Sequence, residues 1–313
     1  MQTASSATIR QDIADALREN LYGRGEFIGT AVMPIYGVTG KSGNFAKIAF
    51  AQQPTSSRVA RAPGAGYSRQ IREGTSDSYA CEEFGREEPI DDGERANLGK
   101  YFDVELDAAE SAAGVILLEQ EARIAAIMHD YTTSFAGCAT DGSAWATAST
   151  GTPIKDVRTA IVTLKKQING GIPVTAKIVA ACTDATLDNA LNTTEVANKL
   201  MYAQKGMIDR EAMVEALAVT MGLNAIFHTS IQRAGASVWT DNVFGIYITA
   251  DGLNLKSVPQ CARTFLWTAD CADNALAETY RDETVRSDVV RVRQHVDEKL
   301  ISARCGHILY GLS

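Results

Sequence analysis

The hydrophobic pattern predicts one very long helix in the first half of the chain. From about Asp103 to Asp130 no proline interrupts the sequence, and apolar or small residues recur at steps of three and four, which keeps one helix face inward. That face carries Ala109, Ala113, Ile116, Gln120, Ile124 and Ile127. About 26 residues at ~1.5 Å each give a rod of about 39 Å, roughly twice an average helix. We therefore expect a scaffold strut.

Weaker patterns precede this helix. Residues 1 to about 25 predict an amphipathic helix with Ile9, Ile13, Leu17 and Leu21 on one stripe. It has little of its own chain to pack on, which suits an extended arm. The β-leaning runs 45–50 and 67–71 flank a polar insert and predict a long hairpin with a loose tip. A polar, strand-like run from Ser78 then leads to a turn at Asp91–Gly93.

The second half of the chain predicts an α/β unit. Pro153 opens a helix in a favoured first-turn position, with Ile154, Val157, Ile161, Leu164 and Ile168 on one face. Further helices are expected over 184–191 and over 210–221, the latter ending at Gly222. Strands are expected over 174–179, 224–229, 243–248 and 264–268. Residues 288–296 alternate valine with arginine, and a last strand is expected over 301–312.

Composition limits the class of protein. A chain of 313 residues suits two medium domains, and 45% hydrophobic residues can fill real cores. The net charge of -8 argues against a protein that coats DNA. We see no signal-peptide pattern and no apolar run long enough for a membrane span, so we expect a soluble protein made in the cytoplasm.

The reactive side chains form no pattern typical of catalysis or metal binding. Six scattered cysteines lack the paired spacing of zinc sites, so buried free thiols are expected (Cys81, Cys138, Cys182, Cys261, Cys271 and Cys305). The four histidines fall in four different elements, and His129 is placed to interact with the helix C-terminal dipole. Thr39–Ser42 resembles a phosphate loop, but Ile35 stands where that loop needs glycine. We expect no catalytic residue, cofactor or metal.

Several short motifs occur in a characteristic order. They are Phe27–Ile28 with Met33–Pro34, Arg61–Gly64, Tyr79–Phe84, Asp91–Asn97, Glu121 with 124–128, Trp145 with Pro153–Ile154, 216–222 followed by 224–228, Val238–Trp239 and Thr264–Trp267. Together their order resembles that of tailed-bacteriophage major capsid proteins over nearly the whole chain.

The resemblance implies an α+β, HK97-like capsid fold. In that fold a peripheral domain combines the long spine helix with a β-sheet, and an axial α/β domain lies beside it. The implied boundaries are an N-terminal arm over 1–44, an extended hairpin loop over 45–76, the peripheral domain over 77–150, the axial domain over 151–280, and strands returning to both domains over 281–313.

The resemblance also implies a function in assembly. Copies of the chain would form hexamers and pentamers of an icosahedral shell, assembled in the host cytoplasm around double-stranded DNA that is contacted without sequence specificity. Scaffolding and portal proteins are the expected partners, with a decoration protein as a further one and no membrane. The alternatives are an encapsulin-type compartment shell and, from a different class, a cytoplasmic α/β enzyme.

Charge is distributed unevenly along the chain. Residues 27–72 carry six basic and no acidic residues, whereas residues 82–119 carry twelve acidic and three basic ones. We hypothesise that the basic hairpin of one subunit lies over the acidic region of its neighbour. The residues are Arg58, Arg61, Arg69 and Arg72 on one side, and Glu82, Glu83, Glu87, Glu88, Asp91 and Asp92 on the other. Ordinary solvated faces, or nucleic-acid contact by the basic segment, are the alternatives.

This hypothesis predicts a collective effect, because each exposed ion pair contributes only about 0.2–1 kcal/mol. Changing Arg58, Arg61, Arg69 and Arg72 together to glutamate should leave the subunit folded by circular dichroism yet abolish closed shells in electron micrographs. Normal particles from this variant would refute the pairing.

Overall fold

The computed structural model describes residues 8–10, 12–13, 17, 27–47, 63–64, 66, 75–101, 103–168, 172, 176–203, 209–249, 260–271 and 274–313. In this part of the chain, none of the helices combines the length and apolar character needed to cross a bilayer.

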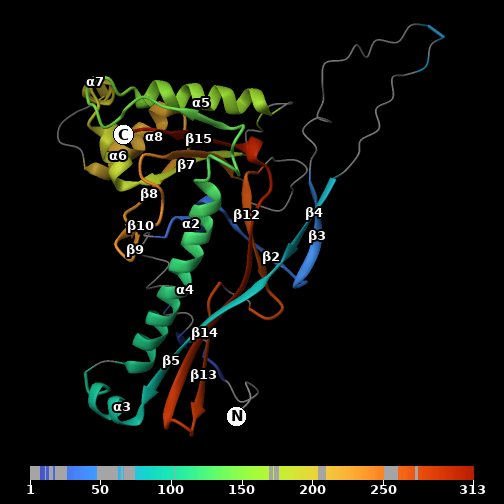
Figure 1. Cartoon of the computed structure of the whole chain (residues 1–313), viewed down its shortest axis with the longest axis vertical. Coiled ribbons are helices and arrows are strands. Elements are labelled where there is room, and N and C mark those ends of the chain that lie inside the picture. Colours follow the sequence, from blue (N-terminus) through green and yellow to red (C-terminus); the bar gives the residue numbers. More distant parts are fainter. Residues whose placement is uncertain are drawn as a thin grey trace.

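The helix α4 (Val104–Met128) connects the two halves of the molecule (Figure 1). It begins after Asp103, whose side chain accepts from the Glu105 N–H at 3.1 Å, and its 25 residues span about 38 Å. Its buried positions are Ala109, Ala112, Ala113, Ile116, Leu117, Gln120, Glu121, Ile124, Ala125 and Met128. The long helix is confirmed; of its predicted inward residues, Ile127 is only half-buried.

A six-stranded sheet packs beside the first half of α4, and its central strand is β14 (Ser287–Leu300). Residues 287–296 of β14 pair with β5 (Glu82–Asp91), and residues 296–300 pair with β12 (Ala262–Trp267). The remaining strands are β13 (Leu276–Asp282), β1 (Thr8–Ile9) and β2 (Ile35–Val38). The four valines of the predicted alternation in β14 are all buried, and Val290 and Val292 belong to the core that this sheet shares with α4.

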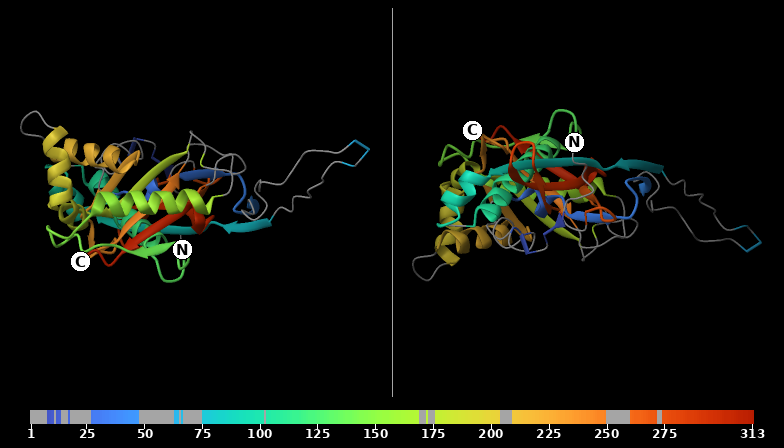
Figure 2. Two further views of the ribbon diagram at one scale, coloured as in Figure 1. Left: turned by 90° about the horizontal axis from the view of Figure 1, so that it is seen from above. Right: turned by 90° about the horizontal axis from the view of Figure 1, so that it is seen from below.

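A five-stranded sheet lies at the other end of α4, in the order β6 (Ala139–Asp141), β15 (Gly306–Tyr310), β11 (Phe244–Thr249), β7 (Lys177–Thr183) and β8 (Ala225–Thr229). Four helices surround it: α5 (Pro153–Gln167), α6 (Asp184–Leu191), α7 (Thr194–Ala203) and α8 (Arg210–Met221). Seen from above, α5 lies across the outer side of this sheet (Figure 2). Every residue of β11 is buried, as expected for a central strand covered on both faces.

The predicted helices of this unit are confirmed. The face of α5 predicted to be apolar is buried, and α6 has the predicted bounds. Helix α8 ends at Gly222, whose φ of 88° is the left-handed conformation that glycine adopts without strain.

Several predictions were wrong in detail. Ile9 lies in strand β1 rather than on the predicted helix. Ile13 and Leu17 are helical as predicted, but they are buried in the core beside α4 of their own chain. The expected turn at Asp91–Gly93 instead opens α3 (Asp92–Leu98), because Asp91 acts as N-cap and accepts from the Gly93 N–H. Helix α7 and strand β13 were not predicted.

Three strands lie elsewhere than expected. β12 was expected to complete the α/β unit, but it pairs with β14 and β2 in the six-stranded sheet. The strand expected over 174–179 is β7 and runs to Thr183, with residues 173–175 outside the described part of the chain. The last strand begins only at Gly306, after a 3₁₀ turn over Ala303–Cys305.

The base of the predicted hairpin is present as β3 (Ser42–Lys47) paired with β4 (Thr75–Ala80). Most of the residues predicted as its strands lie outside the described residues. A small aromatic core holds this base, where Tyr79 stacks on Phe265 at 4.8 Å between ring centroids and Phe45 approaches the same ring at 5.2 Å. All six cysteines are free and buried, as predicted.

Candidate functional site

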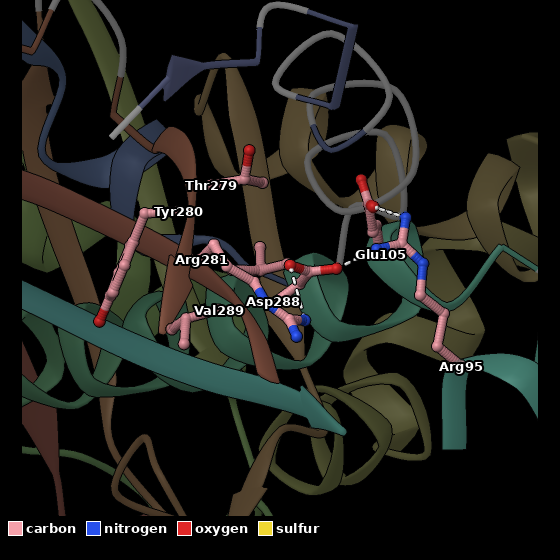
Figure 3. Close-up of a pocket in the computed structure, with 8 residues that line it drawn as sticks. Arg95, Glu105, Thr279, Tyr280, Arg281, Asp288 and Val289 are labelled. Carbon is pink, nitrogen blue, oxygen red and sulfur yellow. Dashed lines mark hydrogen bonds and ion pairs between the residues drawn. The ribbon is translucent and has the colours of Figure 1, made fainter. Parts of the chain in front are cut away.

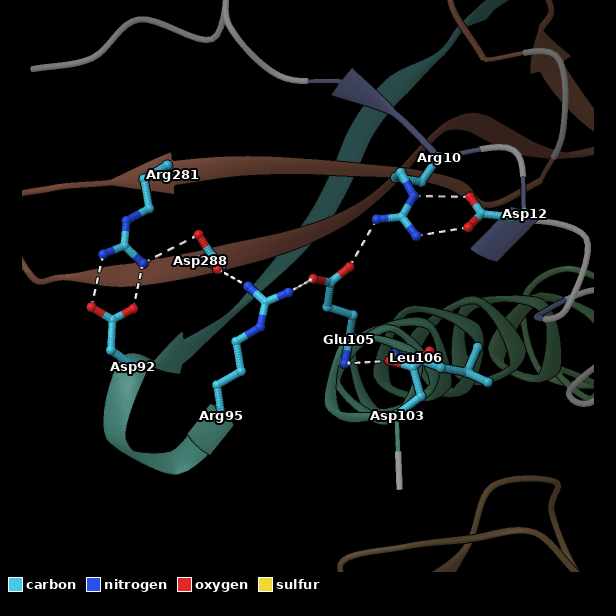
Figure 4. Close-up of polar contacts among 9 residues, drawn as sticks. All are labelled: Arg10, Asp12, Asp92, Arg95, Asp103, Glu105, Leu106, Arg281 and Asp288. Carbon is cyan, nitrogen blue, oxygen red and sulfur yellow. Dashed lines mark hydrogen bonds and ion pairs between the residues drawn. The ribbon is translucent and has the colours of Figure 1, made fainter. Parts of the chain in front are cut away.

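The structure offers two places where charged side chains from distant segments meet: an exposed network at the start of α4 and a buried joint near its end. The exposed network connects four elements and the N-terminal segment (Figure 4). Arg10 pairs with Asp12 at 2.7 Å and with Glu105 at 2.8 Å. Arg95 bridges Glu105 to Asp288.

Arg281 continues this network, contacting Asp288 at 3.2 Å and Asp92 at 2.6 Å. The chain of alternating charges therefore ties α3, α4, β13 and β14 together. Because the groups are exposed or half-exposed, each pair is individually weak, and the main effect of the network is to fix the relative positions of these segments.

A shallow pocket of about 310 Å³ borders the network (Figure 3). Its lining residues are Arg95, Glu105, Thr279, Tyr280, Arg281, Asp288, Val289 and Val290. Each charged side chain among them is bound to an oppositely charged neighbour. The arrangement therefore serves as a structural cross-link rather than as a set of groups poised for acid–base chemistry.

The predicted acidic interface residues lie on β5 and at the start of α3, and most of them are engaged within their own chain. Arg291 binds Glu87 at 2.7 Å, Arg86 binds Glu88 at 3.0 Å, and Asp92 belongs to the network. The Glu83 carboxylate lies 3.8 Å from Nε2 of His295.

Asp91 is used as a helix cap, and Glu82 is exposed on β5. The four arginines predicted to meet these residues lie outside the described part of the chain. The pairing between subunits stays a prediction, but the structure adds a competitor: the chain's own arginines already bind much of the acidic surface.

One group of described residues combines possible metal-binding atoms: Asp270, Cys271 and His295. Asp270 contacts Nε2 of His295 at 2.8 Å. Nη1 of Arg293 binds Asp270 and lies 3.7 Å from Sγ of Cys271 and 3.4 Å from Nε2 of His295. The guanidinium thus supplies the positive charge of this cluster. Burial raises the pKa of Cys271 to about 12, which keeps it a thiol. We interpret the group as an ion-pair cluster.

The buried joint is centred on Glu121, whose side chain is 2% exposed. Its carboxylate accepts from the backbone N–H of Ile28 at 3.1 Å, from that of Gly29 at 2.8 Å and from Nε1 of Trp239 at 2.7 Å. It therefore links α4 to α2 (Gly29–Val32) and to the segment before β11. Burial raises the pKa of Glu121, and the three donors partly offset that rise.

Gly29 leaves room at this joint. A Cβ added there would lie 2.5 Å from Oε2 of Glu121 and 2.9 Å from Cδ1 of Ile124, so a larger residue would force the ends of these two side chains to shift. Sequence reasoning noted Glu121 and Trp239 but did not bring them together, because a contact between residues 118 positions apart leaves no periodic signal.

The end of α4 is anchored beside this joint. Tyr247 donates to the Met128 carbonyl at 2.6 Å, and the rings of His129 and Trp239 meet edge to face at 4.7 Å. His129 is buried, which lowers its pKa to about 4. The predicted charge–dipole interaction is therefore wrong: the imidazole is neutral near pH 7, and its Nε2 faces the Ala181 carbonyl at 3.3 Å.

The sequence matches no protein-family model and no curated protein. The structure is similar to that of a phage-related protein from Bordetella bronchiseptica RB50, with a TM-score of 0.72 and 17% identity, covering 98% of both chains.

Two further similarities are to shells. The virus-like particle from Pyrococcus furiosus matches with a TM-score of 0.56 and 10% identity over 96% of this chain and 98% of that one. The capsid of cyanophage P-SCSP1u matches with a TM-score of 0.55 and 12% identity over 99% and 90%. The fold is therefore one that this chain shares with the proteins of a phage capsid and of a virus-like particle. Specifically, the chain has the HK97-like capsid fold, as its sequence resemblance implied.

The joint predicts energetic coupling between Glu121 and Trp239. Trp239→Phe and Glu121→Gln should each destabilise the protein, because a hydrogen bond to a charged group contributes about 1.5–3 kcal/mol. In urea unfolding, the double variant should lose about 1–3 kcal/mol less free energy of unfolding than the sum of the two single losses. Trp145→Phe is the matched control, since this equally buried indole donates to Asp156 instead. Combined with Glu121→Gln, Trp145→Phe should be additive. If Trp239→Phe were also additive with Glu121→Gln, the joint would be refuted.

His129 predicts a dependence of stability on pH. Its pKa is about 4 in the folded state, against the ordinary 6.5, so the unfolded state binds more protons between these values. The contribution of neutral His129 to the free energy of unfolding is therefore complete above pH 6.5. It is lost as pH falls toward 4, by up to about 3 kcal/mol. Urea unfolding of His129→Gln at several pH values should show a correspondingly flatter profile, whereas parallel profiles would contradict the assignment.

Proposed function

We propose that this chain is the major capsid protein of a tailed bacteriophage, which self-assembles into an icosahedral head around double-stranded DNA. The observation that carries the proposal is the likeness of the whole fold, over nearly the full length of both chains, to the cyanophage capsid and to the phage-related protein. A shell subunit needs a rigid frame with surfaces at several edges. The long α4, fixed to one sheet at each end, provides that frame.

Assembly would proceed through many weak contacts. Each contact between copies contributes little, but closure of a symmetric shell makes the sum large. Hexamers and pentamers would form the shell, with scaffolding and portal proteins as partners during assembly, a decoration protein as a further partner, and DNA contacted without sequence specificity. The virion would be the site of the mature protein.

A second candidate is an encapsulin-type compartment shell, which the likeness to the Pyrococcus furiosus virus-like particle favours. The two candidates differ in content, because a phage head encloses nucleic acid and a compartment encloses protein cargo. The alternative of an α/β enzyme gains little support from the pocket of Figure 3, whose charged groups neutralise one another.

Electron microscopy of the purified protein tests the proposal. We expect closed particles of uniform size, or curved sheets and tubes of the same subunit when the scaffolding partner is missing. Absorbance at 260 nm after nuclease treatment of particles from infected or induced cells should report enclosed DNA. A protein that stays monomeric across salt and protein concentration, alone and with its co-expressed partners, would overturn the assignment.

A further inference from the structure

Helix α5 exposes a basic stripe on its outer side. Its exposed residues are Lys155, Arg158, Thr159, Val162, Lys165 and Lys166. At 100° per residue they fall within about one third of the helix circumference. The one acidic residue of α5, Asp156, turns inward and accepts from Ser143 and Trp145. The outer face of α5 therefore carries four cations and no anion.

Helix α8 exposes a stripe of the opposite sign. Glu211, Glu215 and Val219 recur at steps of four and are exposed, together with Ala212. The first residue of the helix, Arg210, is also exposed, but it pairs with Asp188 at 2.8 Å. The opposite side of α8, with Val214, Leu217, Ala218 and Met221, is buried. A Cβ added at Gly222, directly after α8, would lie 4.0 Å from Cδ1 of Ile161 in α5. The buried sides of both helices belong to one core, which leaves both charged stripes outward.

Most of these charges have no ion-pair partner within the described part of the chain. Of the α5 cations, Arg158 donates to the Thr220 carbonyl at 3.0 and 2.7 Å. No described residue forms an ion pair with Lys155, Lys165, Lys166, Glu211 or Glu215. Most charged groups around the α4 network, by contrast, are paired.

Each stripe also includes an exposed apolar residue. Val162 lies among the α5 cations and is 49% exposed, whereas Val219 follows the α8 acids and is 77% exposed. An apolar centre beside charges is typical of a contact surface, since the valines exclude water while the charges fix register. The cationic stripe from Lys155 to Lys166 is about 17 Å long and the stripe from Glu211 to Val219 about 12 Å, so two helices can pair along their length.

We propose that the α5 stripe of one copy docks on the α8 stripe of a second copy. The contact uses two different surfaces, so it propagates from copy to copy and closes a ring wherever the rotation allows. The inference rests on the proposed shell function and adds to it a specific pair of surfaces. A polyanion such as DNA would also suit the α5 stripe, but it gives no reason for the acidic α8 stripe, and complementarity favours the second copy.

A charge swap tests the contact. Lys155→Glu with Lys166→Glu, and separately Glu211→Lys with Glu215→Lys, should each abolish closed particles in electron micrographs and in sedimentation. The two pairs combined should restore particles and return the net charge to -8. A matched control combines the two α5 substitutions with Glu94→Lys and Asp107→Lys, which reverse exposed acids outside α8. This variant should regain the wild-type net charge but should form no particles.

Folding is checked separately by circular dichroism and Tm of the unassembled subunit. Glu211 lies in the first turn of α8, where a lysine opposes the helix dipole. Glu215→Lys alone is therefore a second variant, and it should lower the particle yield without changing Tm. Raising salt from about 0.15 M to about 1 M shortens the Debye length from about 8 Å to about 3 Å and should weaken wild-type assembly.

The outcomes separate the hypotheses. If wild-type protein forms shells and the α8 reversal forms them equally well, the contact is wrong although the shell function stands. Loss of particles or of packaged DNA in the α5 reversal alone, without rescue by the swap, would indicate a polyanion and overturn the proposal. Failure of the wild type to assemble would instead count against the proposed function.

Discussion

The buried carboxylate of Glu121 is the interaction on which the arrangement of the molecule depends. Removing an ionised carboxylate from water is costly unless donors replace the water, and here the donors come from three sources: two successive backbone N–H groups at the start of α2 and the indole of Trp239. Since these groups belong to different segments, the carboxylate is satisfied only when all of them are in place. The joint thereby fixes the position of the end of α4 relative to the five-stranded sheet.

Packing around this joint makes it rigid. Gly29 leaves room for the carboxylate of Glu121, which a larger residue there would displace, and Tyr247 donates to the last carbonyl of α4. At the other end, α4 packs on β14 through alanines and valines that admit close contact. A long helix fixed at both ends resists bending, which suits the proposed role as a shell subunit.

The surface follows a different principle. The ion pairs of β5, α3 and β14 are numerous but individually weak and salt-sensitive, and they are largely used within the chain. What the folded subunit leaves unpaired among its described residues is therefore more informative than its net charge of -8. A long acidic segment in the sequence is not the same as an acidic surface, because arginines far along the chain, such as Arg281 and Arg291, neutralise it on folding.

The sequence by itself determined the elements whose signals are local. Periodic burial in α4 and α5, the start of α4 near Asp103, the end of α8 at Gly222 and the valine alternation of β14 depend on neighbours a few residues away, so they could be predicted. The order of motifs further identified the fold.

The partners of each element were decided only by the tertiary structure. Ile9 joins a strand because β13 offers it an edge, β12 leaves the α/β unit because β14 pairs with it, and His129 loses its charge because Trp239 and β7 bury it. Such outcomes depend on groups that are distant in the chain, and burial then changes the chemistry of the side chain itself. Glu121 shows this most clearly: in the sequence it is one more acid on a helix, and only the fold supplies the donors that give it a function.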